Sequence, residues 1–198
     1  PFLFDELSLS GFRRIENWMY RPSCSHCNEC KSYRVNVNEF SLTKSLKRIR
    51  KNNTGIIISL KKNLASQEYF DLFSTYQQKR HTGGSMSNMT FEDFKSMIES
   101  SPINTQLCEF RNKEKKLVGL MLFDHQKDGL SAVYSFYDVK FEKSGLGNFM
   151  ILELIELAKK LTLDYVYLGY YIKNAPRMNY KLKFKEGELY SDGKWTKT

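Results

Sequence analysis

The fold is decided by LVGLMLF at residues 117–123, SAVYSFY at residues 131–137 and SGLGN at residues 144–148. The first two stretches are short apolar or aromatic runs of strand length, and the Asp128-Gly129 pair between them is a typical hairpin turn. The third stretch places two glycines at the start of an apolar segment, where the hydrophobic period changes from strand to helix. These residues therefore predict a hairpin followed directly by a helix.

The flanking sequence extends this pattern on both sides. A further strand run, LCEFR at residues 107–111, precedes the hairpin and makes it an antiparallel meander, and DYVYLGY at residues 164–170 follows the helix as one more strand. The helix is strongly apolar along one side, with Phe149, Leu152, Ile155, Leu157, Ala158 and Leu161. Three antiparallel strands, a glycine-opened helix and one more strand is the order of the GNAT-type acyltransferase core. The expected fold class is α+β.

The first half of the chain reads as short strands followed by two helices. Residues 33–37 alternate with period two and residues 55–60 are a β-branched run, so both are expected strands. A helix is expected from Ser66 to about Arg80, and another from Thr90, where Thr-Phe-Glu-Asp resembles a capping box. We expect two regions: residues 1–62, a truncated basic and cysteine-containing N-terminal region, and residues 63–198, the GNAT-like transferase domain.

Positive charge is concentrated in one part of the sequence. The 198 residues contain 31 Lys plus Arg against 22 Asp plus Glu, a formal charge of +9. From Lys31 to Lys62 there are nine basic residues and one acid, Glu39, so this stretch accounts for +8 of the +9. Most charge runs are solvated helix or loop faces. Clustering of nearly the whole net charge, with Arg13, Arg14 and Arg21 nearby, favours a surface for a nucleic-acid backbone.

The apolar stretches and the start of the sequence bear on localisation. No stretch approaches the roughly 18 apolar residues of a membrane span, and the start lacks the basic and apolar regions of a secretory signal. We expect a cytoplasmic protein with no membrane partner, and a monomer. The sequence starts with Pro1, so further native sequence is expected before it.

The Gly145-Leu146-Gly147 segment is a candidate anion site. Glycines at a helix start let backbone N–H groups approach an anion, usually a phosphate, although a tight turn explains the same pair. The GNAT motif usually has Arg or Gln three residues before the first glycine, and this chain has Glu142 there. The acidic residue argues against ordinary binding of the acetyl-coenzyme A pyrophosphate.

In the segments described above and in others along its length, the chain resembles the aminoacyl-tRNA protein transferases of the N-degron pathway, in their bacterial aspartate/glutamate leucyltransferase and arginyltransferase branches. The resemblance runs nearly end to end. It is carried by Gly11-Phe-Arg-Arg14, Tyr20-Arg-Pro-Ser-Cys24 with Cys27 and Cys30, Tyr33-Arg-Val35, Arg80-His-Thr-Gly-Gly-Ser-Met86, Asp128-Gly-Leu-Ser-Ala-Val-Tyr-Ser-Phe-Tyr-Asp138, Ser144-Gly-Leu-Gly147, Tyr167-Leu-Gly-Tyr170 and Met178-Asn-Tyr-Lys181.

The resemblance implies transfer of Leu or Arg from charged tRNA to the N-terminal α-amine of proteins beginning with Asp or Glu, which marks them for N-end rule degradation. The charged tRNA is then a co-substrate, and the chemistry requires no cofactor. An α-amine has a pKa of about 7.7 to 8.0 and is itself the nucleophile, so positioning and oxyanion stabilisation suffice. Candidates for proton relay are Tyr134, Tyr137 and Asp138. Candidates for binding the aminoacyl end are Ser144, Gly145, Leu146, Gly147, Tyr167, Gly169 and Tyr180.

Two further sets of basic residues complete the expected site. An acidic acceptor side chain requires a cation, and the candidates are Arg80, His81, Arg177 and Lys181. The residues expected on the tRNA backbone are Arg13, Arg14, Lys44, Lys47, Arg48, Arg50 and Lys51.

Cys24, Cys27 and Cys30 have a Cys-x2-Cys-x2-Cys spacing that occurs in iron-sulfur sites and partly in zinc sites. A fourth cysteine of the ferredoxin run would stand where this chain has Arg34, so that pattern is incomplete. His26 or Cys108 remains a possible fourth ligand, and reduced thiols without metal are the favoured interpretation.

Two other functions fit the same residues. One is an N-acetyltransferase acting on a small molecule or protein with acetyl-coenzyme A; the other is a noncatalytic tRNA-binding module. The basic cluster, the acyltransferase core and the family segments together favour the tRNA-dependent transferase.

Overall fold

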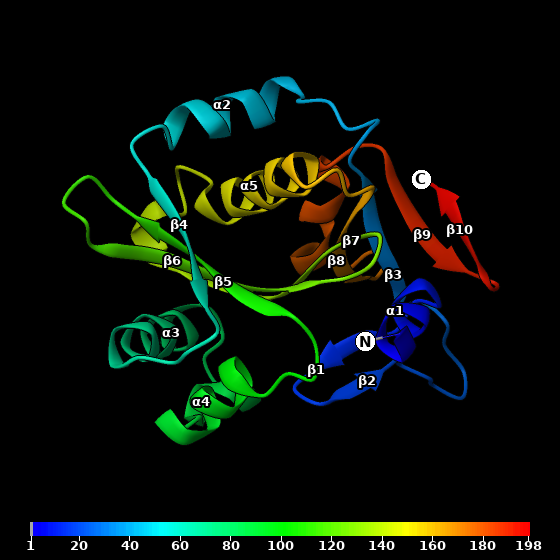
Figure 1. Ribbon diagram of the computed structural model, residues 1–198, viewed down its shortest axis with the longest axis horizontal. Helices are drawn as coiled ribbons and strands as arrows, with labels where there is room; N and C mark the ends of the chain where they lie inside the picture. The colour runs from blue at the N-terminus through cyan, green and yellow to red at the C-terminus, as the bar shows by residue number, and fades with distance from the viewer. Residues whose placement is uncertain (1) are drawn as a thin grey trace.

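The computed structural model describes residues 2–198. Its centre is an eight-stranded sheet in the order β10-β9-β3-β8-β7-β6-β5-β4 (Figure 1). Neighbouring strands of this sheet are antiparallel except β7 and β8, which run parallel. The strands are β3 Lys31–Asn36, β4 Ile57–Lys62, β5 Thr105–Arg111, β6 Leu117–His125, β7 Gly129–Tyr137, β8 Tyr165–Tyr171, β9 Gly187–Ser191 and β10 Lys194–Lys197.

Helices cover both faces of this sheet. Figure 1 shows α2 and α5 on one face and α3 and α4 on the other. The helices are α1 Phe2–Leu9, α2 Lys44–Asn52, α3 Gln67–Arg80, α4 Phe91–Glu99 and α5 Leu146–Lys160, with short 3-10 helices η1 Ser85–Asn88, η2 Val139–Phe141 and η3 Pro176–Lys183. A separate hairpin of β1 Arg13–Ile15 and β2 Trp18–Tyr20 lies beside the sheet.

The sheet separates two hydrophobic cores, and β6 contributes to both. Met121 and Phe123 pack into the core on the α5 side, whereas Leu120 and Leu122 pack with α3 and α4. Successive side chains of a strand point to opposite faces. The uninterrupted apolar run at residues 117–123 follows from burial of both faces of β6.

The elements predicted from the sequence are confirmed in type and order. Ser66 caps α3 by accepting a hydrogen bond from the Tyr69 N–H, and Thr90 with Asp93 forms the expected capping box at α4. The antiparallel meander is β5, β6 and β7, followed by the glycine-opened α5 and then β8. The most basic segment, for which a loop was an alternative, is the helix α2.

The parallel pair β7–β8 holds together at one end only. The register runs from Gly129 opposite Tyr165 to Ser131 opposite Tyr167 and then stops. Register shifts leave Val133 as an extra residue on β7 and Leu168 as an extra residue on β8. Bulges bend strands and leave ladder groups unpaired. The two strands therefore diverge beyond Ser131, and a cleft opens between them.

The expected boundary between residues 62 and 63 falls at the end of β4, inside this sheet. β3 and β4 belong to the expected N-terminal region, yet β3 pairs with β8 and β9, and β4 pairs with β5. Residues 1–62 are thus not a separate structural unit. Within residues 2–198, no helix combines the length and the apolar composition that crossing a bilayer requires.

Candidate active site

A cleft with a volume of about 800 Å³ lies where β7 and β8 diverge. Its walls come from the end of α3, the bulged part of β7, the start of α5 and the 3-10 helix η3, and its lining also includes Arg13 of the β1–β2 hairpin. The lining residues predicted from the sequence are Arg13, Arg80, His81, Tyr134, Tyr137, Gly145, Gly147, Arg177 and Tyr180.

Two tyrosines of β7 stand in this cleft. The Tyr134 hydroxyl accepts a hydrogen bond of 2.6 Å from the Gln77 side chain, and Gln77 is buried. Tyr137 packs against the first turn of α5, where a Cβ on Gly147 would lie 2.9 Å from its ring. Burial raises the pKa of both phenols. Both are therefore protonated at neutral pH and can donate hydrogen bonds or relay a proton.

The turn before α5 brings two opposite charges into the cleft. Gly145 caps the helix in the left-handed region with φ of 76°, where residues with a Cβ are strained. Glu142, just before it, forms an ion pair with Arg80 at the end of α3. Hydrogen bonding to Glu142 raises the pKa of Arg80. The charge of this arginine is thus already balanced inside the cleft.

The rest of the lining contains several basic residues next to apolar ones. His81 ends α3; burial, and then the charges of Arg177 and Arg80, lower its pKa, so that its imidazole is neutral at pH 7. Arg177 is exposed at the cleft wall. Lys79, Asn148 and Lys183 also line the cleft and were not predicted. The position of Lys79 could have been predicted from the sequence, because Lys79 directly precedes the candidate Arg80 in the last turn of the expected helix.

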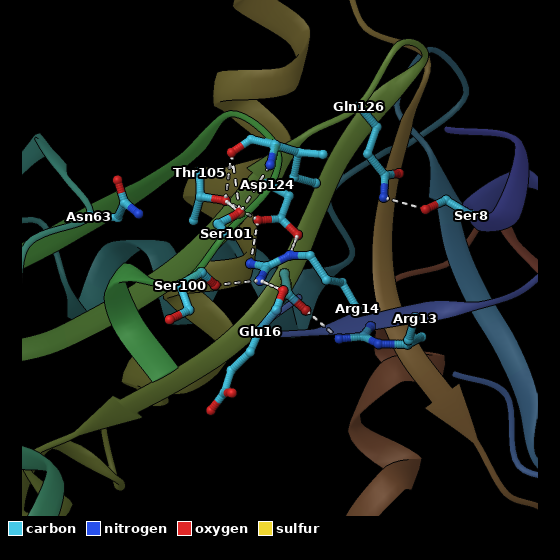
Figure 2. Close-up of polar contacts among 12 residues, drawn as sticks. Ser8, Arg13, Arg14, Glu16, Asn63, Ser100, Ser101, Thr105, Asp124 and Gln126 are labelled. Carbon is cyan, nitrogen blue, oxygen red and sulfur yellow. Dashed lines mark hydrogen bonds and ion pairs between the residues drawn. The ribbon is translucent and has the colours of Figure 1, made fainter. Parts of the chain in front are cut away.

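The neighbouring residues Arg13 and Arg14 leave β1 toward different surroundings (Figure 2). Arg14 is only 7% exposed and makes two hydrogen bonds to Asp124, of 2.6 and 2.7 Å. Arg13 instead donates to the Ala132 carbonyl at 2.7 Å, at the floor of the cleft. Arg14 is thus held by Asp124 in the interior, whereas Arg13 lines the cleft, and the expectation that the two arginines contact the tRNA backbone stays a prediction.

Several other predicted site residues have structural roles outside the cleft lining. Asp138 caps η2 and accepts a hydrogen bond from the Lys140 N–H. Leu146 is fully buried in the core. Tyr167 is buried, donates to Asp128 at 2.9 Å and accepts from Arg34. The roles expected for Asp138 in proton relay and for Leu146 and Tyr167 at the aminoacyl end stay predictions.

Three more predicted residues lie close to the cleft without lining it. The Ser144 hydroxyl donates to the Phe141 carbonyl at 2.7 Å and thus anchors the turn. Gly169 packs against the Arg13 guanidinium. Lys181 is 5% exposed and its ammonium group donates to the Tyr170 carbonyl. Lys181 is therefore not an open cation for an acceptor, although its charge lies behind the cleft.

The basic helix α2 adjoins the mouth of this cleft. Its apolar side packs on the turn before α5, where a Cβ on Gly145 would lie 3.0 Å from Ile49. Asn53 at its end donates to the Ser144 carbonyl at 2.9 Å. Its exposed cations are Lys44, Lys47, Arg48 and Lys51, whereas Arg50 is paired with Glu156 at 2.7 Å. The exposed cations of α2 thus belong to a helix that packs on the turn before α5.

The cysteines surround a second hollow of about 380 Å³, away from the first cleft. Cys24 and Cys27 are exposed, and burial together with the neighbouring thiols raises the pKa of Cys30. Cys108 is buried on β5, with β8, β7 and β6 between it and β3. Among residues 2–198 no group of three or more His, Cys, Asp or Glu side chains is arranged to hold a metal ion. The possible zinc or iron-sulfur cluster at Cys24, Cys27 and Cys30 stays a prediction.

Comparison with known proteins gives consistent matches over the chain. Residues 1–48 match the family model described as Arginine-tRNA-protein transferase, N terminus, and residues 68–191 match Arginine-tRNA-protein transferase, C terminus. An aspartate/glutamate leucyltransferase of Granulibacter bethesdensis is 41% identical over 193 residues, covering 98% of this chain and 72% of the relative. A protein of the same name from Paramagnetospirillum magneticum is 40% identical, covering 98% of this chain and 79% of that protein.

Solved structures share the fold at low identity. FemX aligns with a TM-score of 0.62 at 8% identity, over 94% of this chain and 65% of that chain. L-PGS from Bacillus licheniformis aligns with a TM-score of 0.55 at 13% identity, over 74% of this chain and 47% of that chain. The α+β fold with a GNAT-like core is confirmed.

Proposed function

This chain belongs to the arginine-tRNA-protein transferase family, and from that premise we propose that it transfers leucine from leucyl-tRNA to proteins beginning with Asp or Glu. It is an aminoacyl-tRNA protein transferase. The observation that carries the proposal is the cationic cleft between the diverging strands β7 and β8, adjoined by the basic helix α2.

The lining of the cleft favours a leucyl over an arginyl donor. Met121, Ile151 and Leu168 provide apolar surface of the kind a leucine side chain packs against. The charged side chains in the lining are cations except Glu142, and this carboxylate is already paired with Arg80. A positively charged donor side chain would be repelled here, because like charges brought together in a site of low dielectric are destabilising.

The reaction joins the acceptor α-amine to the carbonyl carbon of the aminoacyl ester. The amide bond forms, the ester bond to the ribose oxygen breaks, and the proton lost by the amine ends on that oxygen. Neutral His81 can accept a proton from the amine, and protonated Tyr137 can donate one toward the leaving oxygen. The bulge at Val133 and the first turn of α5 offer N–H groups to the oxyanion.

The experiment is a transfer assay with leucyl-tRNA and arginyl-tRNA as donors. Peptides identical except for an N-terminal Asp, Glu, Asn, Gln, Arg or Lys serve as acceptors. We expect leucine on the Asp and Glu peptides, and at least tenfold slower transfer of arginine. Faster transfer of arginine reverses the donor assignment. Transfer of acetyl from acetyl-coenzyme A without any aminoacyl transfer contradicts the proposal as a whole.

The role proposed for α2 is tested by a matched pair of arginines on one helix. Arg48→Gln removes an exposed charge, whereas Arg50→Gln removes one that is already paired with Glu156. Each phosphate contact contributes roughly 0.7 to 0.9 to the slope of log affinity against log salt. We expect Arg48→Gln to weaken tRNA binding and reduce the slope by about that amount, and Arg50→Gln to change it less. If the two variants weaken tRNA binding and lower its salt dependence equally, a contact between Arg48 and the tRNA backbone is contradicted.

A further inference from the structure

Arg13 is less exposed than the other arginines and lysines that line the cleft, which are Lys79, Arg80, Arg177 and Lys183. It comes from the β1–β2 hairpin and reaches the floor of the opening between β7 and β8, where its Nη2 donates to the Ala132 carbonyl at 2.7 Å. Its Nη1 is buried and has no hydrogen-bond partner among residues 2–198. A buried donor without an acceptor is costly, and a buried charge without a counter-ion more so. A ligand that brings a hydrogen-bond acceptor to this guanidinium group would therefore stabilise it.

A second buried cation lies close to Arg13. Lys181 is 5% exposed, and its ammonium group bonds to a backbone carbonyl, that of Tyr170, rather than to a carboxylate. Burial, and then the charge of Arg13, lower the pKa of Lys181 to about 8. The nearest acid acting on Arg13 is Asp124, which is already bound by Arg14 and Thr105. Arg13 in the cleft lining and Lys181 behind it are thus two positive charges without a carboxylate of their own.

The backbone of β8 is shaped to admit the Arg13 guanidinium. Gly169 has a φ of 86°, and a Cβ on it would lie 2.5 Å from the Arg13 Nη1. The extra residue Leu168 next to it forms a bulge in β8 just beyond Tyr167, where the pairing with β7 ends. A side chain at position 169 would therefore displace the guanidinium from the floor of the cleft.

We propose that Arg13 binds the side-chain carboxylate of the acceptor's N-terminal Asp or Glu, with the charge of Lys181 behind it. The inference rests on the proposed function and adds the residue that selects the acceptor. A carboxylate matches the planar fork of the guanidinium group and supplies the hydrogen-bond acceptor that the Arg13 Nη1 lacks. The floor lies between two strands, whereas the exposed cations of α2 are on the outer surface, where a nucleic-acid backbone has free access.

The test measures kcat/KM with Asp and Asn peptides, which are nearly isosteric and differ in charge. For Arg13→Met we expect a ten- to hundredfold loss with the Asp peptide, since a charge-assisted hydrogen bond is lost, and less than threefold loss with the Asn peptide. Binding of leucyl-tRNA stays unchanged. Arg177→Met is the control, because it removes an exposed cation of the same cleft and is expected to lower the Asp:Asn ratio less than threefold.

Each other outcome has a distinct meaning. If the wild type transfers leucine to the Asp peptide and Arg13→Met keeps its Asp:Asn ratio, the inference is overturned while the proposed function stands. Equal losses with both peptides, together with weaker leucyl-tRNA binding, assign Arg13 to the donor instead. If the wild type transfers nothing to Asp peptides, the proposed function fails and the inference with it.

Arg13→Lys provides the measurement if Arg13→Met does not fold. A lysine keeps the buried charge, but a single ammonium group cannot bond to Ala132 and present a planar fork to a carboxylate. The expected Asp:Asn ratio falls three- to tenfold. An unchanged ratio in this variant overturns the inference.

Discussion

Arg13 and Arg14 are adjacent in the sequence, and the interior takes up both guanidinium groups, yet they meet opposite electrostatic surroundings. Arg14 bonds to both oxygens of Asp124, which is itself held by Thr105, and to the carbonyl of Glu16. Arg13 bonds to one carbonyl and leaves Nη1 without a partner among the described residues. The alternation of a strand sends consecutive side chains to opposite sides, so one arginine ties the hairpin to β6 and the other reaches the cleft.

The difference separates a structural charge from a charge available to a ligand. A buried ion pair with good geometry is costly to break, because removal of one partner leaves the other charge buried and unpaired. A buried cation without a carboxylate contributes little to the stability of the free protein. Its favourable partner has to come from outside, which is the property of a recognition site.

The largest expected effect is on the paired arginine. Arg14→Met should lower the free energy of unfolding by about 3 to 5 kcal/mol, because Asp124 is left buried without its counter-ion. Urea denaturation monitored by circular dichroism measures this. The double variant Arg14→Met with Asp124→Asn should recover part of the loss. A loss below about 1 kcal/mol for the single variant would show that the pair does not tie the hairpin to the sheet.

The next effect is a pH dependence set by Lys181. The pKa of this ammonium group is about 8 in the folded protein, against an ordinary value of 10.5. Between these values the folded form has released the proton and the unfolded form still holds it, so stability rises with pH. Relative to Lys181→Met, the wild type should gain about 2 kcal/mol between pH 8 and pH 10. Parallel stability curves for the two proteins would contradict a buried, unpaired ammonium.

A smaller effect is expected on stability at the unpaired arginine itself. Arg13→Met removes one hydrogen bond, to Ala132, and also removes an uncompensated buried charge. These two contributions oppose each other, so the free energy of unfolding should change by less than about 1 kcal/mol. Chemical denaturation under the conditions used for Arg14→Met gives the direct contrast. If Arg13→Met lowers the free energy of unfolding as much as Arg14→Met does, the two arginines do not differ in their contribution to stability.

The smallest effect is expected at Arg80, whose charge is balanced by Glu142. Arg80→Gln should change the Asp:Asn ratio of transfer less than threefold, because the removed charge is not available to an acceptor. Exposed ion pairs contribute about 0 to 1 kcal/mol, so stability should change little as well. Kinetics with both peptides measure the ratio. A drop of tenfold or more would make Arg80 the acceptor cation.

The sequence predicted the scaffold of the site better than its charges. The meander, the glycine-opened helix and the β7 tyrosines follow from local patterns, since hydrophobic period and turn residues are read over a few positions. Arg13 and Arg14 were assigned to tRNA from charge alone, because their partners Ala132 and Asp124 lie more than a hundred residues away. The pairing of Arg80 with Glu142 was also hidden, because these two residues are 62 positions apart in the sequence.

The hairpin that carries Arg13 emerges from the ribosome long before the residues that it meets. Its two arginines bond to Ala132 and Asp124, which are 119 and 110 residues away from them along the chain. At a synthesis rate of about 5 to 20 residues per second, the hairpin spends on the order of 5 to 20 seconds outside the ribosome before either partner exists. The part of the cleft that contains Arg13 is therefore assembled late, only after β6 and β7 have been synthesised and have met the hairpin.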